Sequence, residues 1–104
     1  MKNIFWKGYS NEERHLAIDK VQNIVSSYGS IIGFKLFSDI SLTVVIEIEE
    51  SEIDRLYGLL SDNLKMDRHE YLNSDSSRER TLYLNITFAI GTGDRRNEVS
   101  SVPG

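Results

Sequence analysis

A two-residue alternation over residues 41–50, broken on its polar face only by Val45, constrains this chain more than any other feature of its sequence. Side chains on a β-strand point alternately to opposite faces, so the segment predicts a strand with one buried and one wetter face. The apolar positions of the segment are Leu42, Val44, Ile46 and Ile48. Because helices pack on an apolar face of a sheet, we expect Val44 and Ile46 to lie in the core, on the helix side of the sheet.

Three further strands and two helices are predicted around this segment. Residues 3–9, 31–37 and 81–90 carry apolar or aromatic side chains in the pattern of strands. Ser10 and Glu13 form a capping box that predicts the start of the first helix. Ser51 and Asp54 predict the start of the second helix in the same way. The polar segment 65–80 predicts a short strand at 69–72, followed by a serine-rich turn.

The order strand, helix, strand, strand, helix, strand indicates an α+β fold. Two such units commonly build a ferredoxin-like (βαββαβ) antiparallel sheet with both helices on one face. In that topology the first and third strands are central. The short strand predicted at 69–72 could add one extra strand to the sheet. The open face of the sheet is then expected to carry Thr43, Val45, Glu47 and several aromatic rings. We expect residues 1–91 to form a single domain, with residues 92–104 as its extended C-terminal arm.

Composition limits the partners and the compartment. Twelve Lys and Arg residues oppose sixteen Asp and Glu residues, which gives a formal net charge of −4. An acidic chain lacks the positive surface that nucleic acids require, so nucleic acid is not an expected partner. The absence of cysteine excludes disulfides and thiolate chemistry. No stretch has the length of a signal or membrane-spanning segment, so we expect a cytoplasmic protein that does not bind membranes.

The ionisable residues do not form a recognisable catalytic or metal-binding motif. His15 and His69 are the only histidines, and their separation matches no metal-ligand spacing. The carboxylates of residues 47–54 are dense, but strand alternation and the favourable effect of acidic residues at a helix N-terminus explain them. We therefore predict no metal, no cofactor and no catalytic residue, and whether the protein is an enzyme stays open with a preference against it.

A glycine-arginine motif follows the last strand. Gly91 and Gly93 free the backbone to direct N–H groups at an anion, and Arg95 and Arg96 could bind that anion. The motif lacks the following helix and the lysine of a phosphate-binding loop. The simpler interpretation is a turn that ends the strand, and anion binding is the alternative.

The stretch YGSIIGFKLFSDISLTVVIEIEESEIDRLYGLL, with the capped helix before it, resembles an ACT-type regulatory module. The shared pattern is a helix, a glycine, a strand hairpin and a helix that opens with acidic residues. The resemblance covers about half of the chain and implies pairing between subunits and an amino-acid site near the first strand-to-helix loop. That site would comprise Gly8, Tyr9, Ser10 and Asn11, with Ile31 to Gly33 nearby. The Asp-x-Pro-Gly-like loop of the family is absent.

The C-terminal stretch LNITFAIGTGDRRNEVSSVPG resembles a family of small uncharacterised bacterial proteins that end in a similar GTG-to-VPG tail. This likeness implies no activity. It implies only that the tail belongs to the protein.

These observations favour a small non-enzymatic binding or regulatory module that self-associates, as a homodimer, and binds a small ligand or a protein partner. Aromatic residues on the strands could also indicate an RNA-binding sheet, but the basic-Gly-aromatic pattern of such sheets is absent. Two alternatives stay open. One is a small enzyme that acts on an anionic substrate, and the other is an acidic immunity-type protein that masks a basic partner.

Overall fold

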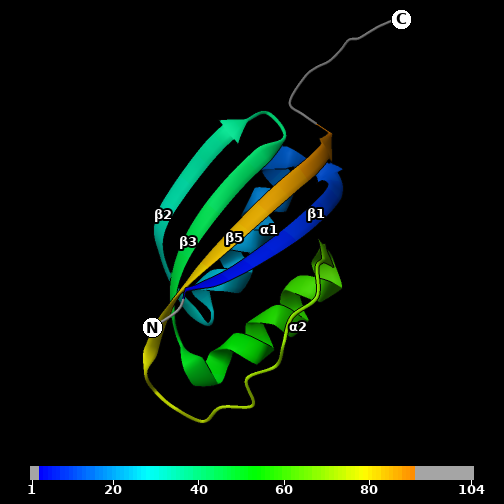
Figure 1. Cartoon of the computed structure of the whole chain (residues 1–104). Helices are drawn as coiled ribbons and strands as arrows, with labels where there is room; N and C mark the ends of the chain where they lie inside the picture. Colours follow the sequence, from blue (N-terminus) through cyan, green and yellow to red (C-terminus); the bar gives the residue numbers. More distant parts are fainter. Residues whose placement is uncertain (1–2, 91–104) are drawn as a thin grey trace, which may run out of the picture.

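The computed structural model describes residues 3–90, which form one mixed β-sheet and two α-helices (Figure 1). The elements in chain order are β1 (Ile4–Glu13), α1 (Arg14–Ser26), β2 (Gly29–Ser38), β3 (Ser41–Glu49), a 3₁₀ turn (Glu50–Glu52), α2 (Ile53–Asn63), β4 (Lys65–Met66) and β5 (Glu79–Ile90). The predicted α+β class and element order are therefore confirmed. An extra short strand is also present, but at Lys65–Met66 and not at residues 69–72. The arm at residues 92–104 and the motif with Gly91, Gly93, Arg95 and Arg96 lie outside the described residues.

The sheet has the order β2-β3-β5-β1-β4, in which β5 lies between β3 and β1. Without β5 the order is β2-β3-β1-β4, with the first and third strands central as in the ferredoxin-like arrangement. The expected wholly antiparallel pairing is wrong, because β5 runs parallel to β1 and antiparallel to β3. Only the two-residue β4 takes the edge place beside β1 that the last long strand was expected to fill.

The reason for this order is the segment between β4 and β5. After β4 the chain returns along α2 to the point where that helix began, and backbone N–H groups of Glu50 and Ser51 donate to carbonyls of Arg78 and Ser76. β5 therefore starts beside the end of β3, with Glu79 opposite Glu49. From there it can only run back antiparallel to β3.

One apolar core lies between the sheet and both helices. α1 lies behind the sheet in Figure 1, and the buried faces of α1, α2 and the strands form a single cluster. Val44 and Ile46 are fully buried in that cluster, as predicted. β1 contributes Trp6 to the core. β3 and β5 contribute Leu42, Val44, Ile46, Ile48, Leu82, Leu84, Ile86 and Phe88, whose regular alternation matches the pattern in the sequence. The opposite face carries Val45, half-buried beside Tyr83 of β5.

Both predicted helix starts are corrected. β1 continues through Ser10 to Glu13, and α1 begins at Arg14, where the Glu13 carboxylate accepts a hydrogen bond from the His15 N–H. Ser10 is buried in the strand, and its hydroxyl oxygen accepts from the Glu12 N–H instead of capping a helix. At the second helix no side chain caps the first turn, because Asp54 binds a distant segment. The strand expected at 69–72 is absent, and β4 forms earlier. No helix among residues 3–90 is long and apolar enough to cross a bilayer.

Candidate ligand-binding cleft

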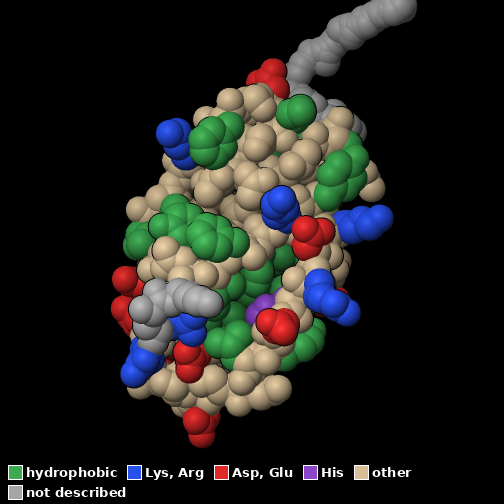
Figure 2. Space-filling view, in the orientation of Figure 1, with side chains coloured by type: hydrophobic (Ala, Val, Ile, Leu, Met, Phe, Trp, Pro, Cys, Tyr) green, Lys and Arg blue, Asp and Glu red, His purple; other side chains and the backbone are tan. Residues whose placement is uncertain are grey.

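A cleft of about 940 Å³ lies between β1 and the segment that connects β4 to β5. Residues 4–6 of β1 form one wall, residues 68–72 form the other, and Arg80 of β5 closes one end. Figure 2 shows a hollow beside the sheet face, with hydrophobic side chains and a histidine inside it and charged side chains around it. The cleft exists because the connecting segment passes outside β1 instead of packing flat against it.

The two ends of the connecting segment are tied to neighbouring elements. At one end the Asp67 N–H donates to the Lys7 carbonyl of β1 at 2.9 Å. At the other end the Glu50 carboxylate accepts from the Ser74 hydroxyl at 2.8 Å and from the Arg80 guanidinium at 2.7 Å. These two contacts, the serine first and the arginine second, hold the pKa of Glu50 below its ordinary value. The segment is therefore a fixed wall although it has no regular secondary structure.

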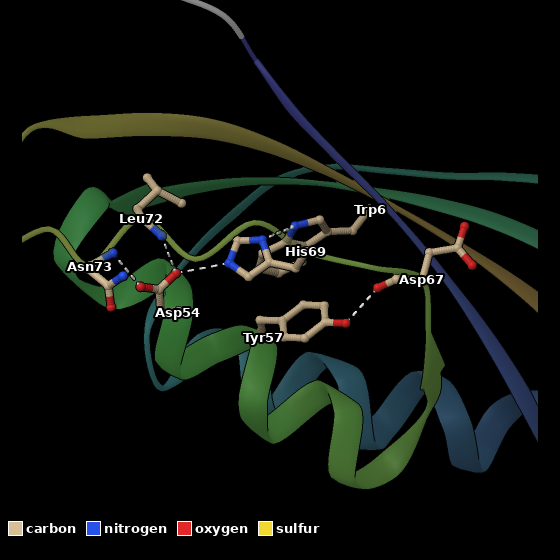
Figure 3. Close-up of polar contacts among 7 residues, drawn as sticks. All are labelled: Trp6, Asp54, Tyr57, Asp67, His69, Leu72 and Asn73. Atoms are coloured by element: carbon tan, nitrogen blue, oxygen red, sulfur yellow. Dashed lines mark hydrogen bonds and ion pairs between the residues drawn. The ribbon is translucent and has the colours of Figure 1, made fainter.

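His69 joins three elements in the middle of this wall (Figure 3). The indole N–H of Trp6, on β1, donates to Nδ1 of His69 at 3.2 Å. An indole can only donate, so Nδ1 carries no proton, and Nε2–H donates to the Asp54 carboxylate of α2 at 2.9 Å. Tyr57 stacks on the imidazole with ring centroids 4.6 Å apart. The imidazole side chain, only 3% exposed, is thus held in one tautomer and one orientation.

The carboxylate of Asp54 accepts the hydrogen bonds that fix the connecting segment to α2. Its Oδ1 accepts from the Leu72 N–H at 3.0 Å as well as from His69, and its Oδ2 accepts from the Asn73 N–H at 2.8 Å. The chain turns sharply here, since Asn73 has a φ of 50°, a conformation that asparagine tolerates better than most residues. Burial raises the pKa of Asp54, but the hydrogen bonds from His69, Leu72 and Asn73 together outweigh it, so that the pKa is lowered.

Acid should weaken the fold through these two carboxylates. Their folded pKa values lie below the ordinary 3.8 for Asp54 and 4.5 for Glu50, so the ionised forms stabilise the fold at pH values above these ordinary ones. That stabilisation is lost as the pH falls through the pKa values that the two carboxylates have in the folded protein. We expect the melting temperature of the wild type to drop more steeply between about pH 5 and pH 3 than that of Asp54→Ala. Thermal melts across this range measure the difference. Parallel curves for the two proteins would contradict the assignment.

The Asp54–His69 pair resembles a catalytic dyad in composition but not in geometry. A general base needs a ring nitrogen that faces the substrate. Here Trp6 occupies one nitrogen of His69 and Asp54 occupies the other. The pair is therefore suited to hold the wall of the cleft in place, and proton transfer would first require one of these bonds to break.

The groups that face the cleft opening are aromatic rings and cations. Phe5 is exposed and stacks on Tyr83 with ring centroids 5.0 Å apart, and Tyr71 is exposed on the opposite wall. Arg68 is exposed and makes no ion pair with any residue from 3 to 90. With Arg80 and Glu70, this gives the lining two cations and one anion, in a chain whose net charge is −4.

The structure places the predicted ligand residues elsewhere. Gly8, Tyr9, Ser10 and Asn11 are consecutive residues of β1 and form no strand-to-helix loop. Gly8 and Tyr9 line a smaller cavity of about 300 Å³ next to β4, where a Cβ on Gly8 would meet the Met66 sulfur at 2.9 Å. Gly33 lies on β2, with β3 and β5 between it and β1, so the structure does not bring it to this group. His15 is exposed on α1, as predicted.

Sequence reasoning missed the residues that build the larger cleft. Trp6, Asp54 and His69 are separated by 48 and 15 residues, so no local motif joins them. The only available signal was the polar segment 65–80 itself, since a long connection in a compact domain is often functional. Among the described residues, no group of three or more His, Asp or Glu side chains could hold a metal ion. Comparison with protein-family models, curated proteins and solved structures found no match to this chain.

Proposed function

We propose that the protein is a non-enzymatic binding module whose cleft beside β1 takes a small anionic ligand that contains a planar ring. The observation that carries the proposal is a rigid cleft whose only histidine has both ring nitrogens engaged within the fold. Ligand sites generally combine apolar walls with a few fixed polar groups. This cleft has both features, and its histidine is not arranged to transfer a proton.

The ligand class follows from the groups at the opening. Phe5 and Tyr71 offer ring faces or edges to a planar group, and such contacts stabilise ring pairs beyond simple burial. Arg68 offers a planar set of N–H donors to a carboxylate or phosphate, and it has no competing ion pair among residues 3–90. Arg80 adds positive charge at the end of the cleft while it remains bound to Glu50.

Phenyl phosphate is a suitable first probe, with inorganic phosphate and benzyl alcohol as the two partial probes. Trp6 is the only tryptophan of the chain and lies in the cleft wall, so its single indole N–H signal in a ¹⁵N-correlated NMR spectrum reports occupancy. We expect phenyl phosphate to shift this signal with a Kd near the millimolar range, and each partial probe to bind more weakly.

Substitution of Arg68 tests the charge contact. Arg68→Ala should weaken phenyl phosphate binding about tenfold, because a hydrogen bond to a charged group contributes about 1.5–3 kcal/mol. Arg55→Ala is the matched control, since Arg55 is exposed on α2, pairs with Glu52 and does not line the cleft. An equal loss of affinity for phenyl phosphate in both variants, or no loss in Arg68→Ala, would contradict the proposal. Release of phenol from the probe would show that the protein catalyses hydrolysis, and would contradict the proposal of a non-enzymatic binding module.

A further inference from the structure

We propose that β2 is a dimerisation strand: two copies of the chain pair antiparallel along β2 and join two five-stranded sheets into one continuous sheet. The proposal does not depend on the cleft. It rests on the contrast between the two edges of the sheet, on the side chains of β2, and on the charge of that edge.

The edge on the β1 side is protected. β4 pairs with only two residues of β1, Gly8 and Tyr9. The connecting segment covers the next part of β1, where the Asp67 N–H donates to the Lys7 carbonyl and His69 binds Trp6. Very short edge strands and covering loops are two ways in which natural sheets avoid pairing with other chains.

The edge on the β2 side has no such protection among the described residues. β2 is ten residues long, contains no proline, and pairs only with β3 within residues 3–90. Its outer backbone N–H and C=O groups therefore form a row that another strand can extend. Two irregularities, between Ile31 and Gly33 and between Leu36 and Ser38, interrupt the register with β3, and the residues from Gly33 to Leu36 pair regularly between them.

The side chains of this edge are unusually apolar. Phe34 and Leu36 lie opposite Val44 and Leu42, which are fully buried, yet they are themselves 43% and 46% exposed. Ile32 and Phe37 are 56% and 60% exposed. Ile40, in the turn that follows, adds to the same region. Phe34 and Leu36 lie on the core face of the sheet, and Phe37 lies beside Lys35 on the other. Exposed apolar side chains on both faces of one edge strand favour an interaction surface there.

A second copy is the occupant that fits this edge. An antiparallel pair of identical strands is related by a two-fold axis, so each copy supplies the same unpaired edge that the other requires. β2 contains no acidic residue, and its only charge is Lys35. The nearest acidic residue along the chain, Asp39, directly follows β2 and pairs with Arg14. No carboxylate lies within β2 itself, so two copies can pair along this strand without opposing carboxylates.

The side chains also select a register. With the two-fold axis perpendicular to the sheet, residues directly opposite each other must lie on the same face. When Phe34 lies opposite Phe34 of the second copy, Lys35 lies opposite Gly33. Beyond Gly33 the bulge at Ile32 interrupts the alternation of β2. Glycine leaves room for the lysine, whose ammonium lies 5.3 Å from the Phe37 ring centre in its own chain. A shift of one residue on each strand would place Lys35 opposite Lys35, which like-charge repulsion disfavours.

The first test is the mass of the full-length protein in solution. Light scattering after size-exclusion chromatography should give twice the 11.9 kDa of one chain at micromolar concentration. Phe34→Lys should raise the dimer Kd at least about a hundredfold, because two lysines then face each other at the axis. Leu16→Lys is the control: Leu16 is similarly exposed, but on α1, and this variant should remain a dimer. A monomeric wild type, or a dimer that Phe34→Lys leaves intact, overturns the proposal.

The second test uses the absence of cysteine from the chain. Under mild oxidation Phe34→Cys should form a covalent dimer, because the two introduced side chains face each other. Phe37→Cys should not, because this register places its two copies about 20 Å apart along the strands. Cross-linking of Phe37→Cys alone overturns the register. Hydrogen exchange of the β2 amides, measured with and without residues 91–104, tests the other occupant of this edge. If the protein is a monomer and the β2 amides lose their protection when residues 91–104 are removed, the edge is covered by the chain's own C-terminal segment and the dimer proposal is wrong.

Discussion

Replacement of Ile46 by alanine is expected to lower the free energy of unfolding by about 2–5 kcal/mol. Ile46 is fully buried on β3, opposite Leu82 of β5 and Ile31 of β2. Its loss removes buried apolar surface and leaves a cavity that neighbouring strands, held on both sides, cannot collapse to fill. Chemical denaturation followed by circular dichroism measures the change.

Leu16→Ala is the control for this experiment. Leu16 is a large aliphatic residue on the exposed surface of α1, so its truncation should change stability by no more than about 0.5 kcal/mol. If Ile46→Ala were as mild as Leu16→Ala, β3 could not be the centre of the core, and the assignment of its two faces would be wrong.

Asp54→Ala is expected to cost about 1–3 kcal/mol and to loosen the whole cleft wall. The substitution leaves the Nε2–H of His69, buried beneath Tyr57, without its acceptor, and it removes the acceptor of two backbone N–H groups. The connecting segment should then exchange its amide hydrogens faster, starting at Leu72 and Asn73. Hydrogen exchange followed by mass spectrometry would locate the effect.

Asp62→Ala provides the comparison on the same helix. Asp62 is exposed near the end of α2, and none of the hydrogen bonds to the connecting segment involves it. We expect near-wild-type stability and exchange for this variant. Uniformly faster exchange in Asp54→Ala, with no preference for residues 67–78, would show that Asp54 supports the helix and not the cleft wall.

The two proposed surfaces lie on opposite sides of the molecule. The cleft is at the β1 side of the sheet, and the proposed dimer forms at the β2 side, with β3 and β5 between them. Pairing through β2 would therefore place the two clefts at the far ends of a continuous sheet, both accessible. Ligand binding and dimerisation can for this reason be disrupted separately, by Arg68→Ala and by Phe34→Lys.

Local pattern alone determined the elements and the core of this protein. The alternation in residues 41–50 and 81–90 predicted which side chains of β3 and β5 are buried, because a strand has a side-chain period of two whatever its neighbours are. The hairpin of β2 and β3 followed from their closeness in the chain. Helix starts were predicted less well, since Ser10 and Ser51 match a capping pattern that a continuing strand and a 3₁₀ turn override.

Only the tertiary structure decided where β5 lies and what Asp54, His69 and Trp6 do. The place of β5 depends on how far the connecting segment travels back along α2, and a polar segment carries no periodicity that encodes its path. The cleft depends on that same path, because it brings His69 between a strand and a helix that are distant in the sequence. Alternation sets which face of a strand is buried, whereas contacts between distant residues set which strands are neighbours and where a site can form.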